Sequence, residues 1–320
     1  MPTYDKTILA DKAKEIHVVR DTLEKVCRLR DILRFFDSSE LLRNALALKG
    51  GTAINLLFFN LPRLSVDIDL DFAENLPRAE MLETRKRIGE LIGKYMVSEG
   101  YSLSPKTKTP HSLDSLVYEY MNTGGVKDNI KIEINYSLRE HVLPLRRMRM
   151  QSEVFDGDFE VLTVAPEEIY ATKTVALLTR AAARDLYDVN YMVKYGLFDE
   201  AQTEQYRKCV VFYLAVATAV PPLKLDLTAM NAIDSHDIKT ALGPVIRDLE
   251  VFRLEDAKKT VGDYLTRNLS LTTEELRFLR EFKRGRYYPE LLFPDEETQI
   301  RLKTHPMALW KIARHKEQAR

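Results

Sequence analysis

Apolar residues in the first half of the chain recur with the periods of both helices and strands. Helical spacing over Lys12–Phe36, and again over residues 78–99, predicts two amphipathic helices. Apolar and polar residues alternate over Leu64–Phe72 and over Asn129–Tyr136, which predicts two half-buried strands. Leu113–Met121 alternates in the same way and precedes a Gly-rich turn, so we expect a hairpin with the second strand.

From Pro166 onward the pattern is mainly helical. Pro166 and the two glutamates after it are typical of a helix start. A final helix over residues 305–311 is expected to be anchored in the core by Trp310, the sole tryptophan. Further helices are expected over Ala201–Ala219, Ile238–Phe252, Leu254–Asn268 and Thr273–Lys283.

A chain of 320 residues is long enough for two domains, each with its own core. We expect a bilobed α+β fold, in which a small mixed-sheet core is followed by a helical C-terminal domain. The expected domains are residues 1–165, with the N-terminal helices and the core, and residues 166–320.

The chain has 48 acidic and 48 basic residues, so its formal net charge is zero and no overall field attracts nucleic acid. Any contact with RNA must therefore be local. Two clusters of cations are candidates, and a solvated surface is the alternative for both. They comprise Arg139, Arg146, Arg147 and Arg149, and also Arg277, Arg280, Lys283, Arg284 and Arg286 beside Tyr287 and Tyr288.

The two cysteines, Cys27 and Cys209, lie far apart without metal-ligand spacing, which fits a reducing cytoplasm. Charges near the N-terminus argue against a secretory signal. The uncharged stretch Cys209–Leu223 is too short to span a membrane and predicts a buried helix. Zinc-hydrolase, serine-hydrolase and Walker-type patterns are absent from the sequence. We therefore expect a cytoplasmic protein without membrane association.

Acidic residues occupy the polar face of the first predicted strand. Asp67 and Asp69 are two residues apart, so both project from one face. Carboxylate oxygens suit Mg²⁺ or Mn²⁺, and two such ions can clamp the attacking and leaving oxygens of a phosphoryl transfer. Glu133, on the polar face of the second strand, is the candidate third acid if the two strands are neighbours. Solvated strand faces are the alternative.

Gly50, Gly51 and Thr52 precede a helix-like segment. Glycines allow backbone N–H groups to approach a triphosphate at a helix N-terminus, where the dipole favours anions, although a simple turn is the alternative. Arg63 could pair with a phosphate or a structural carboxylate. Ser65 could contact the triphosphate, be modified, or serve only as a polar residue at the start of the strand.

Lys173, Arg180 and Arg184 recur at helical spacing after Pro166. Such a cationic stripe could neutralise phosphates, as Lys and Arg side chains do in phosphoryl-transfer enzymes. The alternative is a solvated basic helix face.

Together these segments resemble the nucleotidyltransferase AbiEii/AbiGii toxin family, a branch of the DNA polymerase β-like superfamily. The resemblance spans most of the chain. It implies an NTP-using toxin of a type IV toxin–antitoxin or phage-defence pair, with Mg²⁺ or Mn²⁺ as cofactor and a separately encoded, AbiEi-like antitoxin as partner. It rests on Leu48–Ala53, Pro62–Asp69, Lys131–Ile134, Pro166–Glu168 with Lys173, Arg184–Asp188 and His305–Lys311.

The family has a functional Lys and an Arg-Asp pair, and the resemblance assigns these roles to Lys173, Arg184 and Asp185, with Arg180 and Asp188 as second choices. The expected metal ligands are Asp67, Asp69 and Glu133, and the expected catalytic residues are these three with Lys173 and Asp185. The expected nucleotide-binding residues are Gly50, Gly51, Thr52, Arg63, Ser65, Lys173 and Arg184.

We therefore expect transfer of NMP from an NTP to an acceptor hydroxyl, at an RNA 3′ end and in particular that of tRNA, with release of pyrophosphate. The alternatives are nucleotidylation of a protein or small molecule, transfer of the γ-phosphate by a kinase, and non-catalytic binding of RNA or protein. Intact Asp67, Asp69 and Lys173 argue against the last alternative.

Overall fold

The computed structural model describes residues 4–59, 61–150, 159–247 and 251–318. The chain forms two compact units. Each unit includes one short segment from the other half of the sequence. Residues 140–144 belong to the unit built mainly from the second half, and residues 245–248 belong to the unit built mainly from the first half. Unit 1 comprises Met1–Arg139, Leu145–Val164 and Val245–Asp248, and unit 2 comprises Glu140–Pro144, Ala165–Pro244 and Leu249–Arg320.

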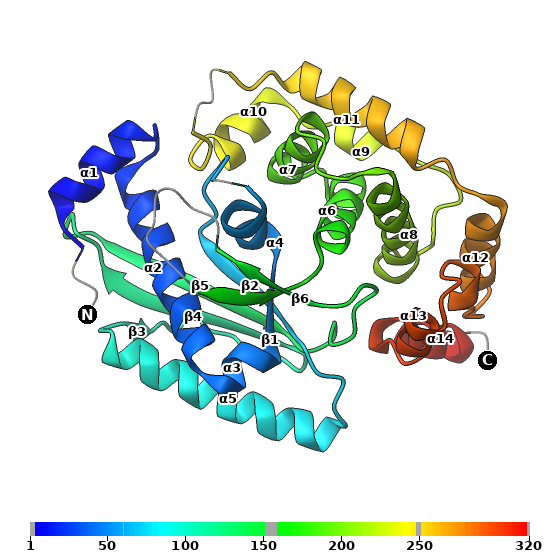
Figure 1. The fold of residues 1–320 in the computed structure, drawn as a ribbon, viewed down its shortest axis with the longest axis horizontal. Coiled ribbons are helices and arrows are strands. Elements are labelled where there is room, and N and C mark those ends of the chain that lie inside the picture. Colours follow the sequence, from blue (N-terminus) through cyan, green and yellow to red (C-terminus); the bar gives the residue numbers. More distant parts are fainter. Residues whose placement is uncertain (1–3, 60, 151–158, 248–250, 319–320) are drawn as a thin grey trace. The chain divides into compact units, whose positions relative to one another are not determined.

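A seven-stranded mixed sheet forms the centre of unit 1 in the described residues (Figure 1). The strand order is β3-β4-β5-β2-β1-β7-β6, with β2 parallel to β5 and β1 parallel to β7. The expected α+β fold with a mixed-sheet core is confirmed. The strands are β1 (Leu46–Lys49), β2 (Asp67–Phe72), β3 (Ser102–Leu103), β4 (Leu113–Met121), β5 (Lys127–Asn135), β6 (Arg146–Arg149) and β7 (Glu160–Thr163).

Apolar side chains line one face of the central strands of this sheet. Leu70 of β2 lies opposite Leu48 of β1 and Ile134 of β5, so apolar side chains align across three strands. Among the helices, Phe35 of α2 stacks on Tyr95 of α5 with ring centroids 3.8 Å apart. The helices are α1 (Lys6–Glu15), α2 (Arg20–Ser38), α3 (Glu40–Ala45), α4 (Gly50–Ala53), the π-helical turn Ile54–Phe58 and α5 (Arg78–Ser98).

The prediction of a single helix over Lys12–Phe36 is wrong, because the helix is interrupted between α1 and α2. His17 adopts φ +57°, in the left-handed region. The N–H of Val18 donates to the carbonyl of Ala13 at 2.9 Å, the six-to-one bond of a Schellman helix stop. The apolar spacing continues across the break, which conceals it in the sequence.

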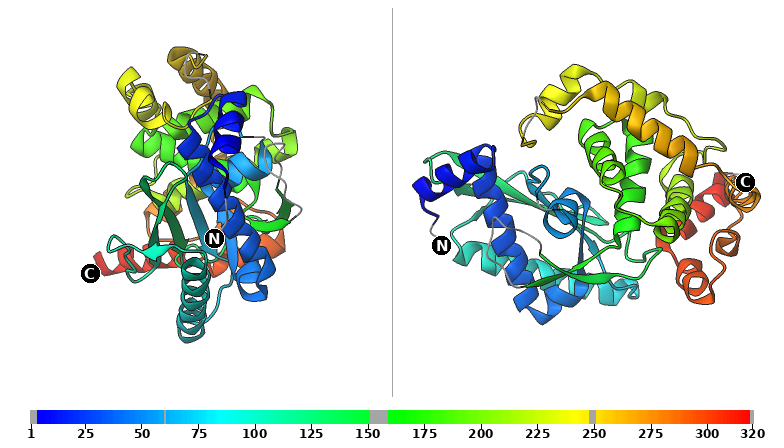
Figure 2. Two further views of the ribbon diagram at one scale, coloured as in Figure 1. Left: turned by 90° about the vertical axis from the view of Figure 1, so that its left-hand side faces the viewer. Right: turned by 45° about the horizontal axis from the view of Figure 1, so that its top comes forward.

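Helices make up the regular structure of unit 2 in the described residues (Figure 2). The expected helices that correspond to α8, α11 and α12 are confirmed. The helix expected over Ile238–Phe252 is wrong in its described part, because Gly243 and Pro244 follow one π-helical turn. The helices are α6 (Pro166–Arg180), α7 (Ala183–Lys194), α8 (Glu200–Ala217), α9 (Thr228–Asn231), α10 (Ser235–Asp237), α11 (Leu254–Asn268), α12 (Thr273–Lys283), α13 (Glu296–Lys303) and α14 (Pro306–Gln318).

In the described part of the chain, none of these helices combines the length and the apolar character needed to cross a membrane.

Helix α14 docks through a lysine and not through the tryptophan that the sequence suggested. Trp310 is 54% exposed, so its expected role as a core anchor is wrong. The buried Lys311 instead donates from Nζ to the carbonyls of Ala215 and Thr218 at the end of α8. A cation at this position satisfies carbonyls that a helix C-terminus leaves without partners.

A buried polar network fixes residues 140–144 within unit 2. Glu168 is fully buried and accepts from the N–H groups of Val142 and Leu143 at 3.1 and 2.9 Å. Burial raises the pKa of Glu168, but hydrogen bonds from His141, Tyr213 and the Leu143 N–H outweigh it, so the pKa lies below its ordinary value. Glu168 is therefore held as a charged anchor.

His305 makes unit 2 sensitive to acid. Burial lowers the pKa of His305 from 6.5 to about 4, and the negative charge of Glu168 only partly opposes this effect. The neutral imidazole accepts from the N–H of Ala308 through Nδ1, which caps α14. Since the folded pKa is depressed, this stability is present above pH 6.5 and is lost as the pH falls towards 4.

We predict that His305→Asn, which keeps a capping oxygen but cannot titrate, reduces the acid sensitivity of unit 2. Relative to pH 8, the unmodified protein should lose about 2 kcal/mol more than the variant at pH 5. Urea unfolding at a series of pH values, followed by far-UV circular dichroism, measures the difference. Equal losses in both proteins would contradict the proposed linkage.

Candidate active site

The carboxylates predicted from the sequence meet on the polar face of the sheet in unit 1. Asp67 and Asp69 lie on the same face of β2, because residues two apart on a strand share a face. β2 and β5 are parallel neighbours, and Asp69 lies directly opposite Glu133 in their register. The expected adjacency of the two strands is therefore confirmed. The roles of these three acids stay predictions.

Lys131 lies within this acidic face, and its role was not predicted from the sequence. It is opposite Asp67 in the register, and its Nζ lies 2.9 Å from Oε1 of Glu133. Burial lowers the pKa of Lys131, but the hydrogen bond with Glu133 and the charges of Glu133, Asp67 and Asp69 outweigh it and raise the pKa. The three carboxylates therefore act together on one cation.

Gly50 packs directly against Asp69. It has φ +68°, which glycine adopts readily and other residues do not. A Cβ at this position would lie 2.6 Å from Oδ2 and 3.3 Å from Cβ of Asp69. Only a glycine therefore allows the start of α4 to lie this close to the carboxylate.

Gly51 occupies a similarly tight position. A Cβ there would lie 2.8 Å from Nη2 of Arg63 and 2.9 Å from Oγ of Ser65. The neighbouring Thr52 donates from its hydroxyl to the carbonyl of Asp67, which ties α4 to β2. The predicted glycine, arginine, serine and aspartate residues are thus brought together around one loop.

Arg63 serves the architecture of this loop, whatever else it binds. Its side chain is almost wholly buried, and Nη1 donates to the carbonyl of Leu64 at 3.0 Å. Asn55, which the sequence analysis did not single out, accepts from the N–H of Arg63 and donates to the carbonyl of Gly51. The segment of unit 1 that begins at Val245 also supports this loop, because the N–H of Leu64 donates to the carbonyl of Val245 at 2.6 Å.

Asp71, the third aspartate of β2, has a structural partner. It is 3% exposed and pairs with Nζ of Lys49, on the neighbouring strand β1. A buried carboxylate needs such compensation. Asp71 therefore fixes the end of β1 immediately before the glycine pair.

The donor set suits a hard divalent cation in its chemistry. Asp67, Asp69 and Glu133 offer carboxylate oxygens, and Gly50 leaves backbone space beside them that a Cβ would fill. In the described residues, however, no three His, Cys, Asp or Glu side chains form a ready-made metal cluster. Glu133 is engaged by Lys131, so a bound cation would compete with that ammonium.

Lys173 and Asp185 belong to unit 2, where they form an ion-pair network. Nζ of Lys173 lies 2.8 Å from Asp185 and 3.2 Å from Asp188, and Arg180 also pairs with Asp185 at 3.1 Å. Both aspartates are buried, and each is 1% exposed. Lys173 therefore neutralises the two buried carboxylates of α7 together with Arg180.

The expected cationic stripe is divided between two helices. Ala181 has φ +55° and ends α6, so Arg184 lies on α7 and not on the helix of Lys173. Nε of Arg184 donates to the carbonyl of Ala241 at 2.7 Å. The predicted nucleotide-binding role of Arg184 stays a prediction.

Comparison with known proteins identifies the family. The fold is similar to that of MenT4, a nucleotidyltransferase toxin from Mycobacterium tuberculosis H37Rv, with a TM-score of 0.63 at 17% sequence identity, over 96% of this chain and 99% of that chain. No curated protein matches the sequence. The family model described as nucleotidyl transferase AbiEii toxin, type IV TA system, matches residues 32–267. The chain therefore belongs to the AbiEii family of nucleotidyltransferase toxins of type IV toxin–antitoxin systems.

Proposed function

We propose that the protein transfers NMP from an NTP to a hydroxyl at an RNA 3′ end, in particular that of tRNA, in a reaction that depends on Mg²⁺ or Mn²⁺. Family membership makes it a nucleotidyltransferase and implies an NTP substrate and an antitoxin partner. The single observation that carries the proposal is the register that sets Asp69 opposite Glu133, with Asp67 on the same face of β2 and Gly50 packed against Asp69.

The proposed reaction exchanges one bond to the α-phosphorus for another. The acceptor oxygen forms a bond to the α-phosphorus, the bond to the pyrophosphate oxygen breaks, and pyrophosphate leaves with the electron pair. In this proposal Glu133 either completes the metal site or receives the hydroxyl proton. Asp67, Asp69 and Glu133 would hold the divalent cation, which supplies positive charge to the phosphate oxygens when bound.

The glycine loop and the cations provide the nucleotide contacts in this proposal. Backbone N–H groups at Gly50 and Gly51, with Thr52 and Ser65, would bind the triphosphate. Lys173 and Arg184 are assigned to the same substrate and Asp185 to catalysis, from the family resemblance. Buried Arg63 is assigned to hold the loop in the shape that binds phosphate.

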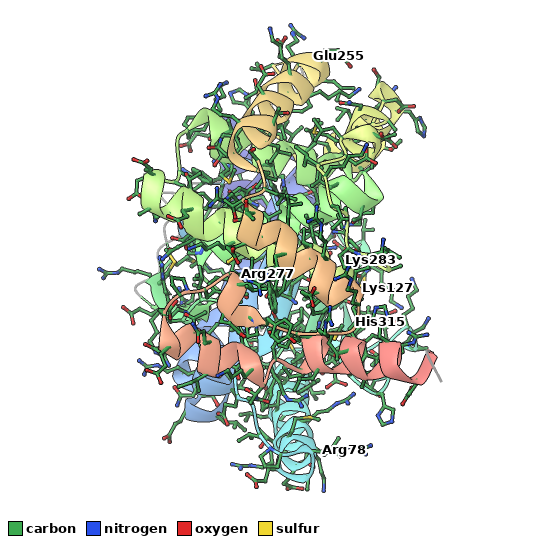
Figure 3. All side chains as sticks on the ribbon, turned by 90° about the vertical axis from the view of Figure 1, so that its right-hand side faces the viewer. Arg78, Lys127, Glu255, Arg277, Lys283 and His315 are labelled. Carbon is green, nitrogen blue, oxygen red and sulfur yellow. The ribbon has the colours of Figure 1, made fainter. Side chains whose placement is uncertain are left out.

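Local positive charge supports an RNA acceptor. Arg146, Arg147 and Arg149 are exposed on β6, at the edge of the sheet. Arg277 and Lys283 project from α12 on the face drawn in Figure 3. Several cations of the second cluster pair with glutamates of the same helix, which reduces the charge they offer to a phosphate backbone.

We predict that Asp69→Asn abolishes transfer of label from an α-³²P-NTP to bulk RNA, because it removes a charge from the carboxylate set. Glu119→Gln on β4 is the matched control and should retain transfer, since Glu119 pairs with Ser104 and Lys127. Each of the four NTPs is supplied in turn. Label in protein instead of RNA, or γ-label on any acceptor, would replace this proposal with protein modification or a kinase reaction.

We predict that Gly50→Ala loses at least about 10-fold in transfer rate, because the added methyl group displaces Asp69. Gly125→Ala is the control: Gly125 also has a positive φ, +76°, but its Cβ would meet nothing within 4 Å. Both variants should lose stability by about 1 kcal/mol from backbone strain. Similar activity in the two variants would count against the close packing of the loop on Asp69.

We predict that Lys131→Gln lowers the Mg²⁺ concentration needed for half-maximal activity several-fold. The ammonium and the metal compete for the same carboxylates, so removing one should favour the other. Lys127→Gln, at the exposed start of β5, should leave the Mg²⁺ requirement unchanged. A higher Mg²⁺ requirement for Lys131→Gln would show that the lysine assists the site instead of competing for it.

A further inference from the structure

Tyr187 and Tyr191 of α7 and Tyr195, the residue that caps its C-terminus, follow at four-residue intervals, and their rings form a continuous ladder. The centroids of Tyr187 and Tyr191 are 5.9 Å apart with an interplanar angle of 26°. Those of Tyr191 and Tyr195 are 4.3 Å apart at 33°. Four-residue spacing places side chains on one face of a helix, so the three rings follow a single line.

The ladder leads from the interior of unit 2 to its surface. Tyr187 is 8% exposed, Tyr191 is intermediate, and Tyr195 is 57% exposed. A tyrosine that only stabilises a core is expected to be largely buried. More than half of the last ring is instead presented to solvent, where a planar ligand can reach it.

A surface pocket adjoins the inner end of the ladder. Phe252 contacts Tyr187 with ring centroids 5.6 Å apart and also lines a pocket of about 400 Å³. Ser235, Arg253, Glu255 and Asp256 supply polar groups to its wall. Hydroxyl and carboxylate oxygens can accept hydrogen bonds from the amino groups of a base. Within unit 2, α7 contacts α11 and also the π-helical turn Ile238–Leu242 that follows α10, and Ile238 lines the same pocket (Figures 1 and 2).

Positive charge is available at both ends of this surface. Lys194 is exposed directly before Tyr195, and Arg253 is exposed directly after Phe252. Aromatic faces flanked by cations are the combination that binds unpaired nucleotides, because the rings stack on bases while the cations pair with phosphates. A folded duplex keeps its bases stacked on one another and does not offer them to such a surface.

We propose that this tyrosine ladder and the pocket beside Phe252 bind unpaired nucleotides of the acceptor RNA, with one base stacked on Tyr195. The inference rests on the proposed RNA acceptor and specifies it as RNA with an unpaired end. Tyr195 is a binding residue in this proposal and takes no part in the chemical step. Its removal should therefore raise the KM for RNA without changing kcat or the KM for NTP.

The test uses the full chain with Asp69→Asn, which prevents turnover, and a short single-stranded RNA that carries 2-aminopurine near its 3′ end. Stacking quenches 2-aminopurine fluorescence, so the signal reports the contact directly. Adding Tyr195→Ala should weaken binding by about 5-fold or more and reduce the quenching, while Tyr195→Phe should preserve both. Trp310→Ala is the control, because Trp310 is similarly exposed in the same unit at 54%. A blunt duplex should bind weakly to every variant.

The outcomes separate this inference from the proposed function. If the unmodified protein labels RNA but Tyr195→Ala binds and quenches normally, the ladder proposal is overturned and the RNA acceptor stands. If the Asp69→Asn protein binds single-stranded RNA through Tyr195 while the unmodified protein labels only protein, the ladder stands and the acceptor proposal falls. Loss of binding in Tyr195→Phe or Trp310→Ala as well would assign Tyr195 a structural role and overturn the inference.

Discussion

The two-sided character of β2 and β5 is the constraint on which unit 1 depends. The apolar residues of these strands are buried on one face of the sheet, so the carboxylates that alternate with them project from the opposite face. A register shift of one residue in β2 would bury Asp67 and Asp69 and expose the core side chains. The hydrophobic pattern that stabilises the sheet therefore also sets the register between Asp69 and Glu133.

The glycine loop that follows β1 is held in place by the same aspartates of β2. Asp71 pairs with Lys49 and fixes the end of that strand, and the chain then turns at Gly50 against Asp69. Asn55 and Arg63 tie the loop to the segment that returns to β2. Because residues 245–247 complete this arrangement through Val245, the geometry of the loop depends on chain from the second half of the sequence.

Local patterns predicted β2, β4 and β5 and the shared polar face of Asp67 and Asp69, because alternation acts over a few residues, but they did not predict the short strands β1, β3, β6 and β7. The same patterns could not reveal features that depend on backbone choice or on distant partners. The helix stop at His17 does not interrupt the apolar spacing, so the sequence pattern does not reveal it. Likewise, nothing in the local pattern around Trp310 shows that Lys311 is the residue that docks α14, because its partner carbonyls at the end of α8 lie far away in sequence. Lys131 alternates in phase with Glu133, but its coupling to Asp67 and Asp69 follows only from the pairing of two strands.

Lys173 shows why a proposed functional role can be hard to test by substitution. Its ammonium compensates two buried aspartates, and an uncompensated buried carboxylate costs several kcal/mol. A neutral residue at position 173 would thus disturb the packing of α6 on α7 as well as any phosphate contact. A loss of activity in that variant has two sources, whereas a change at Asp69 or Gly50 acts on the polar face of the sheet itself. The carboxylate face is therefore the place where structure and chemistry can be separated by mutation.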